Sequence, residues 1–202
     1  LAFLGWNPGT PQEIFNMQEL INDFSLERVG KSGAKFDFDK TKWFNQQYLR
    51  ATSKEELSTA LQIILKENGI EAEDNFVSLV CEQLKERATF VKDMWEEGKY
   101  YFEAPTSYDE KTIRKKWKEE TPKYMSELKD RLAGLSDFSS ENIEVEFKKY
   151  LEENELGMGK VLPAFRVSLT GLGMGPSLFD IAALLDKEET IARMETALNT
   201  IQ

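Results

Sequence analysis

Apolar residues recur along the chain at the spacing of helix faces, and polar residues that suit helix starts precede several of the apolar runs. Asn16 with Glu19, and Ser53 with Glu56, have the spacing of capping boxes, and Asp37 suits the start of a helix between them. The pattern predicts helices over residues 16–24, 25–29, 37–49, 53–69, 73–87, 89–97, 140–154, 160–169, 177–185 and 187–201.

The middle of the chain carries two more helix starts. Ser107 and Glu110 have capping-box spacing ahead of a helix through residues 111–120. Thr121 with Pro122 is typical of an N-cap followed by a proline in the first helical turn. Two helices are therefore expected to meet near residue 121.

No segment alternates apolar and polar residues for long enough to predict a strand, and the aromatic run at residues 100–102 is interpreted as a buried connector. The sequence predicts an all-α protein in two parts, because a newly capped helix and a change in charge composition coincide near residues 51 and 52. The expected parts are residues 1–51 and 52–202, with a further division of the second into 52–135 and 136–202 as an option.

Composition is that of a folded protein, since 41% of the 202 residues are apolar. The single cysteine cannot form an internal disulfide, and no apolar run approaches the ~20 residues that span a bilayer, so a soluble, cytoplasmic protein is expected. The net charge of -10 argues at first against nucleic acid. The acid is concentrated in residues 51–110, however, which hold 14 acidic and 6 basic side chains, so a basic patch elsewhere keeps its own local field.

The chain lacks histidine, which removes the commonest general base and the commonest metal ligand. The carboxylates of Glu152, Glu153 and Glu155 are interpreted as a solvated helix end rather than an acid-base or metal site. We expect no catalytic residue and no metal site here. Because the chain starts at Leu1 without methionine, it is interpreted as a piece of a longer protein whose active site would lie upstream.

A basic stripe is predicted on the helix through residues 111–120. Lys111, Arg114, Lys115 and Lys118 fall three or four positions apart, so their side chains share one face of a helix. The stripe is interpreted either as a set of phosphate contacts or as a solvated face balanced by the glutamates that follow it.

Two arginines, Arg87 and Arg166, each sit in a largely apolar helix pattern. Each either pairs with a carboxylate or extends its charged end to solvent, or it uses its planar fork of donors to bind the edge of an unstacked base.

Two glycine-containing stretches are candidates for backbone contact with a ligand. Residues 171–180, GLGMGPSLFD, form either a plain turn or a close backbone approach to a phosphate or base, and they lack the Gly-Lys-Ser/Thr ending of a P-loop. Lys31, Ser32 and Gly33 are interpreted as a solvated connector between helices.

Two stretches resemble bacterial glutamyl-tRNA synthetases. LAFLGWNPG and the following QEIFNMQELINDFSLERVGKSGAKFDFDKTKWFNQQYLR resemble the segment after the catalytic domain, and LPAFRVSLTGLGMGPSLFDIAALLDKEETIARM resembles the C-terminal end of the family. The resemblance spans the chain and is strongest at residues 1–50 and 160–195.

The resemblance implies a class I aminoacyl-tRNA synthetase that activates glutamate with ATP and Mg²⁺ and transfers it to tRNA(Glu). The adenylate-binding motifs of that family would lie before residue 1, so this chain alone should be inactive and hold no cofactor. Residues 1–51 would be the end of the stem-contact domain and residues 52–202 the anticodon-binding helical domain. The expected partner is tRNA(Glu), with no DNA or membrane partner, and the expected state is a monomer.

The resemblance also implies particular anticodon contacts. Arg87, in KERATF, falls where the family faces the first anticodon base. Arg166, in PAFRVSLTG, and Gly175 with Leu178, in GMGPSLF, fall where later anticodon bases are held. The alternative is a helical protein-interaction module whose apolar faces serve a protein partner and which does not bind RNA.

Overall fold

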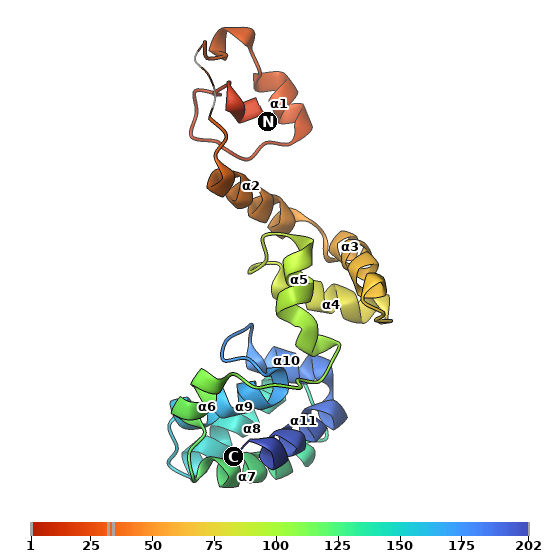
Figure 1. The fold of residues 1–202 in the computed structure, drawn as a ribbon, viewed down its shortest axis with the longest axis vertical. Coiled ribbons are helices and arrows are strands. Elements are labelled where there is room, and N and C mark those ends of the chain that lie inside the picture. Colours follow the sequence, from red (N-terminus) through yellow and green to blue (C-terminus); the bar gives the residue numbers. More distant parts are fainter. Residues whose placement is uncertain (1, 32, 34, 202) are drawn as a thin grey trace.

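The computed structural model describes residues 2–31, 33 and 35–201, and it arranges their helices in three tiers along one long axis (Figure 1). No strand occurs in these residues, where the only bridge of strand type is an isolated antiparallel pair, Trp6 with Val29. The all-α prediction is confirmed. No helix in the described part of the chain is long and apolar enough to cross a membrane.

The top tier contains α1 (Met17–Asp23) and α2 (Phe38–Ala51). Both predicted starts are confirmed, because Asn16 and Glu19 form a reciprocal capping box and the Asp37 carboxylate accepts from the Lys40 amide at 2.9 Å. The helix expected at residues 25–29 is a single 3-10 turn, Leu26–Arg28. Of the predicted connector at residues 31–33, Ser32 lies outside the described residues.

The middle tier packs α3 (Lys54–Glu67) against α4 (Asp74–Leu84) and α5 (Val91–Gly98). The capping box at Ser53 and Glu56 is confirmed. The helix predicted through residue 87 ends at Leu84 instead, so Arg87 lies in the following turn.

The start of α5 explains this early end. The Asp93 carboxylate accepts from the amides of Thr89 and Phe90 at 2.9 and 2.8 Å, so it stabilises a non-helical chain just after Arg87. Arg87 and Ala88 both donate their amides to the Leu84 carbonyl, which closes the last turn of α4.

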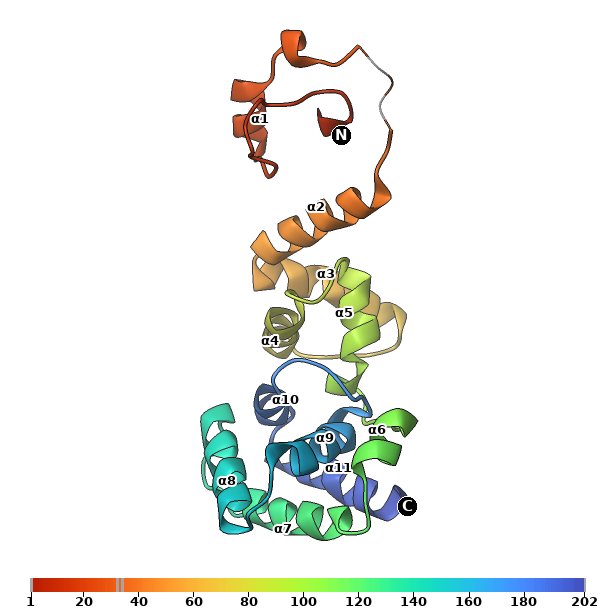
Figure 2. The same cartoon turned by 90° about the vertical axis from the view of Figure 1, so that its left-hand side faces the viewer.

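The bottom tier contains six helices, drawn in Figure 2 from the side, and the main hydrophobic core continues from the middle tier into it. They are α6 (Glu110–Lys116), α7 (Thr121–Ala133), α8 (Ser140–Glu153), α9 (Met158–Thr170), α10 (Leu178–Leu185) and α11 (Lys187–Thr200). The helices predicted from residue 140 onward are thus confirmed, although α9 begins two residues earlier than expected. A single residue, Asp186, separates α10 from α11 and has the positive φ of 69°.

The helix α6 departs from its prediction at both ends. Its N-cap is Asp109, whose carboxylate accepts from the Thr112 amide at 2.7 Å, rather than Ser107. It ends at Lys116 because the Thr121 hydroxyl accepts from the Lys118 amide at 2.8 Å and donates to the Lys116 carbonyl at 3.2 Å. That side chain replaces the main-chain hydrogen bonds of another helical turn.

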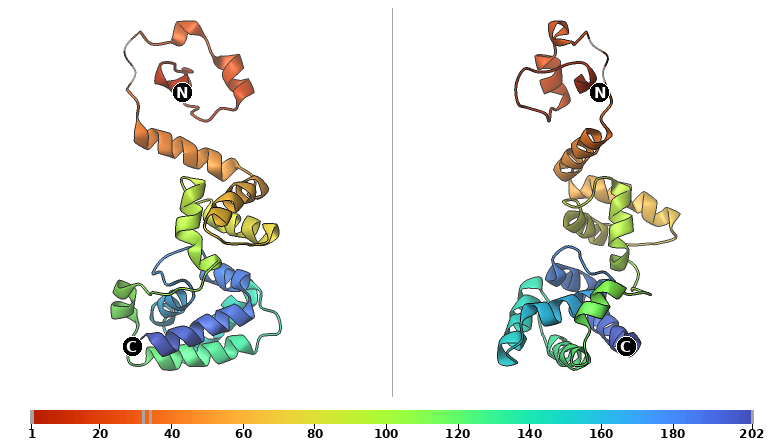
Figure 3. Two further views of the ribbon diagram at one scale, coloured as in Figure 1. Left: turned by 45° about the vertical axis from the view of Figure 1, so that its right-hand side comes forward. Right: turned by 60° about the vertical axis from the view of Figure 1, so that its left-hand side comes forward.

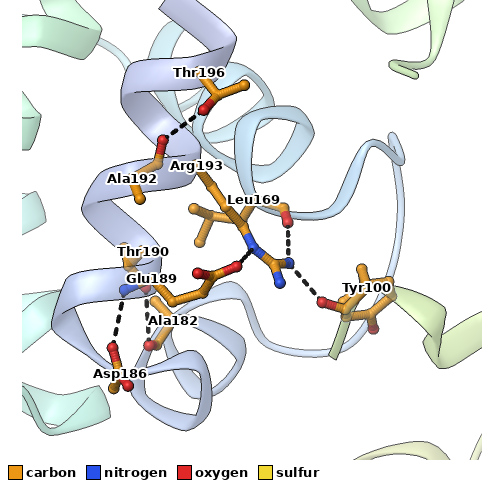
Figure 4. A network of polar contacts seen from close by, with 9 residues as sticks. All are labelled: Tyr100, Leu169, Ala182, Asp186, Glu189, Thr190, Ala192, Arg193 and Thr196. Carbon is orange, nitrogen blue, oxygen red and sulfur yellow. Dashed lines mark hydrogen bonds and ion pairs between the residues drawn. The ribbon is translucent and has the colours of Figure 1, made fainter. Parts of the chain in front are cut away.

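The middle and bottom tiers meet at a short buried connector, which Figure 3 shows below α5 and beside the loop between α9 and α10. The connector contains the 3-10 turn Lys99–Tyr101, and Tyr100 and Tyr101 are both buried, as predicted for this aromatic run. Arg193 of α11 is buried against it and donates to the Tyr100 carbonyl (Figure 4). The two tiers are therefore fixed to each other through main-chain contacts as well as apolar packing.

Candidate nucleic-acid interface

A groove of about 790 Å³ lies between the middle and bottom tiers. Its wall is built from the turn after α4, from α5, from the Lys99–Tyr101 turn, from α6 and from the connector between α9 and α10. Four of the residues predicted from sequence line it: Arg87, Lys111, Lys115 and Gly175. The groove therefore joins segments that are far apart in the chain.

Arg166 lies on α9 directly behind Gly175. A Cβ atom placed on Gly175 would lie 3.0 Å from Arg166 Nη1 and 3.8 Å from the hydroxyl oxygen of Tyr100. Among the described residues, no carboxylate lies within ion-pair distance of Arg87 or Arg166. The carboxylate-paired interpretation of these two arginines is therefore wrong for this part of the chain.

The surroundings of Arg166 are unusual for a cation. Burial lowers the pKa of its guanidinium, and the positive charge of Arg87 lowers it further, whereas the nearby hydroxyls of Tyr100 and Tyr101 oppose the shift. An arginine remains protonated in proteins even so. The site therefore holds a partly buried positive charge with no counter-charge paired to it, which favours a ligand rich in acceptor atoms.

Tyr100, predicted from sequence only as part of a buried connector, lines the same groove. Its side chain is buried, and its hydroxyl has no hydrogen-bond partner among the described residues. A tyrosine in a buried connector is a weak signal by itself. The stronger signal, that its hydroxyl lies beside Arg166 and Gly175, depends on tertiary structure.

Leu178 does not lie in the groove. It is the first residue of α10, and its side chain is 2% exposed within the hydrophobic core. Any contact of this residue with a ligand would have to come from its backbone. Of the four predicted residues, Arg87 and Gly175 line the groove, Arg166 lies behind Gly175, and the Leu178 side chain lies in the core.

The predicted basic stripe is divided, and its last member, Lys118, lies beyond the end of α6 at Lys116. Lys111 and Lys115 line the groove, whereas Arg114 and Lys118 do not. Lys118 folds back instead, and its ammonium donates to the Arg114 carbonyl at 2.6 Å. Lys116, which is not part of the predicted stripe, also lines the groove, and its ammonium donates to the Gly159 carbonyl at 3.1 Å.

The groove also carries acidic side chains, so its charge is mixed. Glu96 and Glu97 of α5 and Asp109 face the basic residues across it. The Asp109 carboxylate is engaged as the N-cap of α6, and its hydrogen bonds with Thr112 hold its pKa below the usual range. No group of three or more metal-ligating side chains was found among the described residues.

Close backbone contacts fix the start of the glycine-rich connector. Gly171 has a φ of +73°, and a Cβ atom there would lie 2.5 Å from the Ser107 carbonyl oxygen. A Cβ atom on Gly173 would overlap with Thr112 of α6. These approaches need glycine, and they place Gly175 over Arg166. Packing against the segment before α6 and against α6 itself therefore fixes the start of this connector.

Comparisons with known proteins give consistent matches. The sequence model of a family described as "Anticodon binding domain" matches residues 46–198. A glutamate–tRNA ligase of Phocaeicola vulgatus is 48% identical over 202 residues, which are 100% of this chain and 40% of that protein. A second, from Flavobacterium psychrophilum, is 49% identical over 201 residues, with 100% and 40% covered.

The fold is also matched among solved structures. The crystal structure of a glutamate tRNA ligase from Elizabethkingia meningosepticum, in complex with its amino acid, has a TM-score of 0.94 and 42% identity. The match covers 100% of this chain and 40% of that one. The chain thus spans about 40% of the length of the relatives that it matches.

Proposed function

The chain belongs to the anticodon-binding domain family, and from this premise we propose that it is the tRNA-recognising part of a glutamate–tRNA ligase. In this proposal the groove between the middle and bottom tiers receives the anticodon of tRNA(Glu). The observation that carries it is that Arg87 lines the groove and Arg166 lies behind Gly175 in its wall, near enough to Arg87 for the two charges to interact, and that neither has an ion-pair partner among the described residues.

The chemistry of the groove suits unpaired bases. Arginine presents a planar fork of donors that can bind a base edge and also stack on it, and glycine backbone allows a base to approach closely. Arg87 is exposed and can meet a base first, whereas Arg166 is held by the packing of α9. Lys111 and Lys115 on the rim would contact the phosphates of the same loop.

The charge of the whole chain is compatible with this function. Although the net charge is -10, the basic residues of the groove act locally, because screening limits the reach of distant carboxylates to about 8 Å at physiological salt. Recognition would depend on a few directed hydrogen bonds more than on overall attraction.

The proposal divides the longer ligase by task. Residues 1–51 would contact the tRNA stem and residues 52–202 the anticodon, while the activation of glutamate with ATP and Mg²⁺ would belong to sequence outside these 202 residues. This chain alone would then bind tRNA(Glu) as a monomer in the cytoplasm without aminoacylating it.

Binding of tRNA(Glu) transcripts tests the proposal. Substitutions in the anticodon should weaken binding to the 202-residue chain more than substitutions in the acceptor stem. Arg166→Ala should cost about 1–3 kcal/mol of binding free energy if it loses a base-edge contact. Arg166→Lys is the matched control for charge, since lysine keeps the charge but not the fork, and it should recover only part of the loss.

Equal affinity for tRNA(Glu) and unrelated tRNAs would contradict anticodon recognition. If the chain also failed to bind tRNA at low salt and copurified with a protein, the alternative of a protein-interaction module would be favoured.

A further inference from the structure

Four buried side-chain polar atoms in the described part of the chain lack a hydrogen-bond partner, and two of them lie beside Gly175, which lines the groove. These two are the Tyr100 hydroxyl and Arg166 Nη1, which both face Gly175. The other two are apart from each other: Trp6 Nε1 is in the top tier, and Arg50 Nε is 3.1 Å from the Glu86 carboxylate. Unpaired buried polar atoms are rare, and a neighbouring pair beside a groove points to a ligand that completes them.

Two groups beside the Tyr100 hydroxyl have partners of their own. The neighbouring Tyr101 hydroxyl donates to Gln83, and the Tyr100 carbonyl accepts from Arg193 (Figure 4). Burial raises the pKa of Tyr100, although the neighbouring Tyr101 hydroxyl and the charge of Arg166 oppose the shift, so the Tyr100 hydroxyl stays neutral and can either donate or accept a hydrogen bond. Arg166 Nη1 can only donate. The pair therefore suits a ligand with one acceptor atom beside a second polar atom.

The edge of a nucleobase has this arrangement of atoms. Each base presents acceptors and donors next to one another along its edge, and an unstacked base can offer that edge to a protein. A phosphate would accept a hydrogen bond from Arg166. It offers acceptor atoms only, however, so it could not use the ability of the Tyr100 hydroxyl to accept a hydrogen bond as well as donate one. Base recognition is therefore the better fit to the two groups together.

The backbone at Gly175 covers the pair in the free protein, because both atoms are out of contact with water. The structure records no hydrogen bond between the backbone of residues 173–176 and the other described residues. Met174, within this stretch, is 79% exposed. Gly173 itself is packed against Thr112, but residues 174–176 beyond it can move aside without breaking a main-chain hydrogen bond.

We infer that the Tyr100 hydroxyl and Arg166 Nη1 together bind the edge of one unstacked anticodon base, which takes the place of the backbone at Gly175. Tyr100 is then a specificity-determining residue, and Arg193 positions it. This inference rests on the proposed function, and it adds the residue and the way in which one base is bound.

The substitution Tyr100→Phe tests the inference because it removes the hydroxyl and keeps the ring. The probes are a stem-loop RNA with the tRNA(Glu) anticodon and three versions with one anticodon base changed. We expect Tyr100→Phe to weaken binding of the cognate loop by about 5- to 10-fold, the value of one hydrogen bond, and to remove discrimination at one anticodon position only. The Tm of the free protein should be unchanged or raised, since an unpaired buried hydroxyl is removed.

The matched control is Tyr101→Phe, whose hydroxyl has an internal partner. It should lower the Tm and leave the discrimination between loops unchanged. A lower Tm for Tyr100→Phe would overturn the inference, because it would reveal an internal partner for that hydroxyl. Full retention of discrimination by Tyr100→Phe would also overturn it. If the wild-type chain bound all four loops equally, the proposed function itself would fail, which is a different result.

Discussion

Arg193 and Tyr100, 93 positions apart in the chain, are joined by a hydrogen bond of 2.5 Å from guanidinium Nη1 to the Tyr100 carbonyl oxygen. The same nitrogen donates to the Leu169 carbonyl at 2.8 Å, and Nε donates to the Glu189 carboxylate at 2.7 Å. One side chain therefore holds α11, the end of α9 and the connector between the tiers in a fixed arrangement (Figure 4).

Arg193→Ala should lower the free energy of unfolding by about 3 kcal/mol, because it leaves two buried carbonyls without a donor. Urea unfolding measures this change. Glu189→Gln is the control, since it keeps an acceptor for Nε at a half-exposed position and should cost less than about 1 kcal/mol. Equal costs for the two variants would mean that the carbonyl contacts contribute little.

Gly171→Ala should destabilise the chain more than Gly69→Ala. Both glycines have positive φ, +73° and +76°, but a Cβ atom at Gly171 would meet the Ser107 carbonyl, while nothing lies within 4 Å at Gly69. The Gly69 variant thus measures backbone strain alone, about 1 kcal/mol, and the Gly171 variant adds the overlap, for a total of about 2–3 kcal/mol. Thermal unfolding of both variants gives the comparison, and similar losses would rule out tight packing at Gly171.

Lys111→Ala and Lys115→Ala should each reduce the salt dependence of tRNA binding. If each lysine contacts one phosphate, the slope of log K against log salt should fall by about 0.7 to 1 per substitution. Arg114→Ala is the control, because Arg114 has the same charge on the same helix but does not line the groove. Titrations at several salt concentrations measure the slopes. If Arg114→Ala reduced the slope as much as the lysine substitutions, the basic residues would act by general electrostatic attraction to tRNA rather than by phosphate contacts at the groove.

Cys81 should not react with thiol reagents in the folded protein at pH 8. The side chain is buried in α4, and burial, with a smaller contribution from Glu82, raises its pKa from 9.0 to about 12. Because folding raises this pKa, the protonated thiol contributes stability to the folded state, and that contribution is complete below pH 9. The contribution is lost as the pH rises from 9 to about 12. The stability difference between wild type and Cys81→Ala should therefore narrow over that range. A constant difference would contradict the raised pKa.

The sequence predicted the helices well where local chemistry decides them. The capping residues Asn16, Asp37 and Ser53 make the hydrogen bonds expected of them, since each depends on residues three positions away. The ends of α4 and α6 were predicted too late. In both places a side chain beyond the helix, Asp93 or Thr121, supplies the competing hydrogen bonds, and apolar periodicity does not record it.

The candidate site was predicted in part, for a related reason. Arg87, Arg166 and Gly175 were identified from the resemblance to a family, and the structure places Arg87 and Gly175 in one groove wall with Arg166 directly behind Gly175. Leu178 was included with them, but its position at the start of α10 turns its side chain into the core. Tyr100 was missed because its environment comes from three segments distant in sequence.

The one-residue link at Asp186 sets the angular phase of α11 relative to α10. Each residue advances a helix by about 100° around its axis, so one inserted residue at this link would turn the inward face of α11 by more than a quarter of a circle. Arg193 would then point away from Tyr100 although no contacting residue had been altered. Spacing at a site remote from the groove is thus a determinant of its shape, and length variation there should be read as a change in the binding surface.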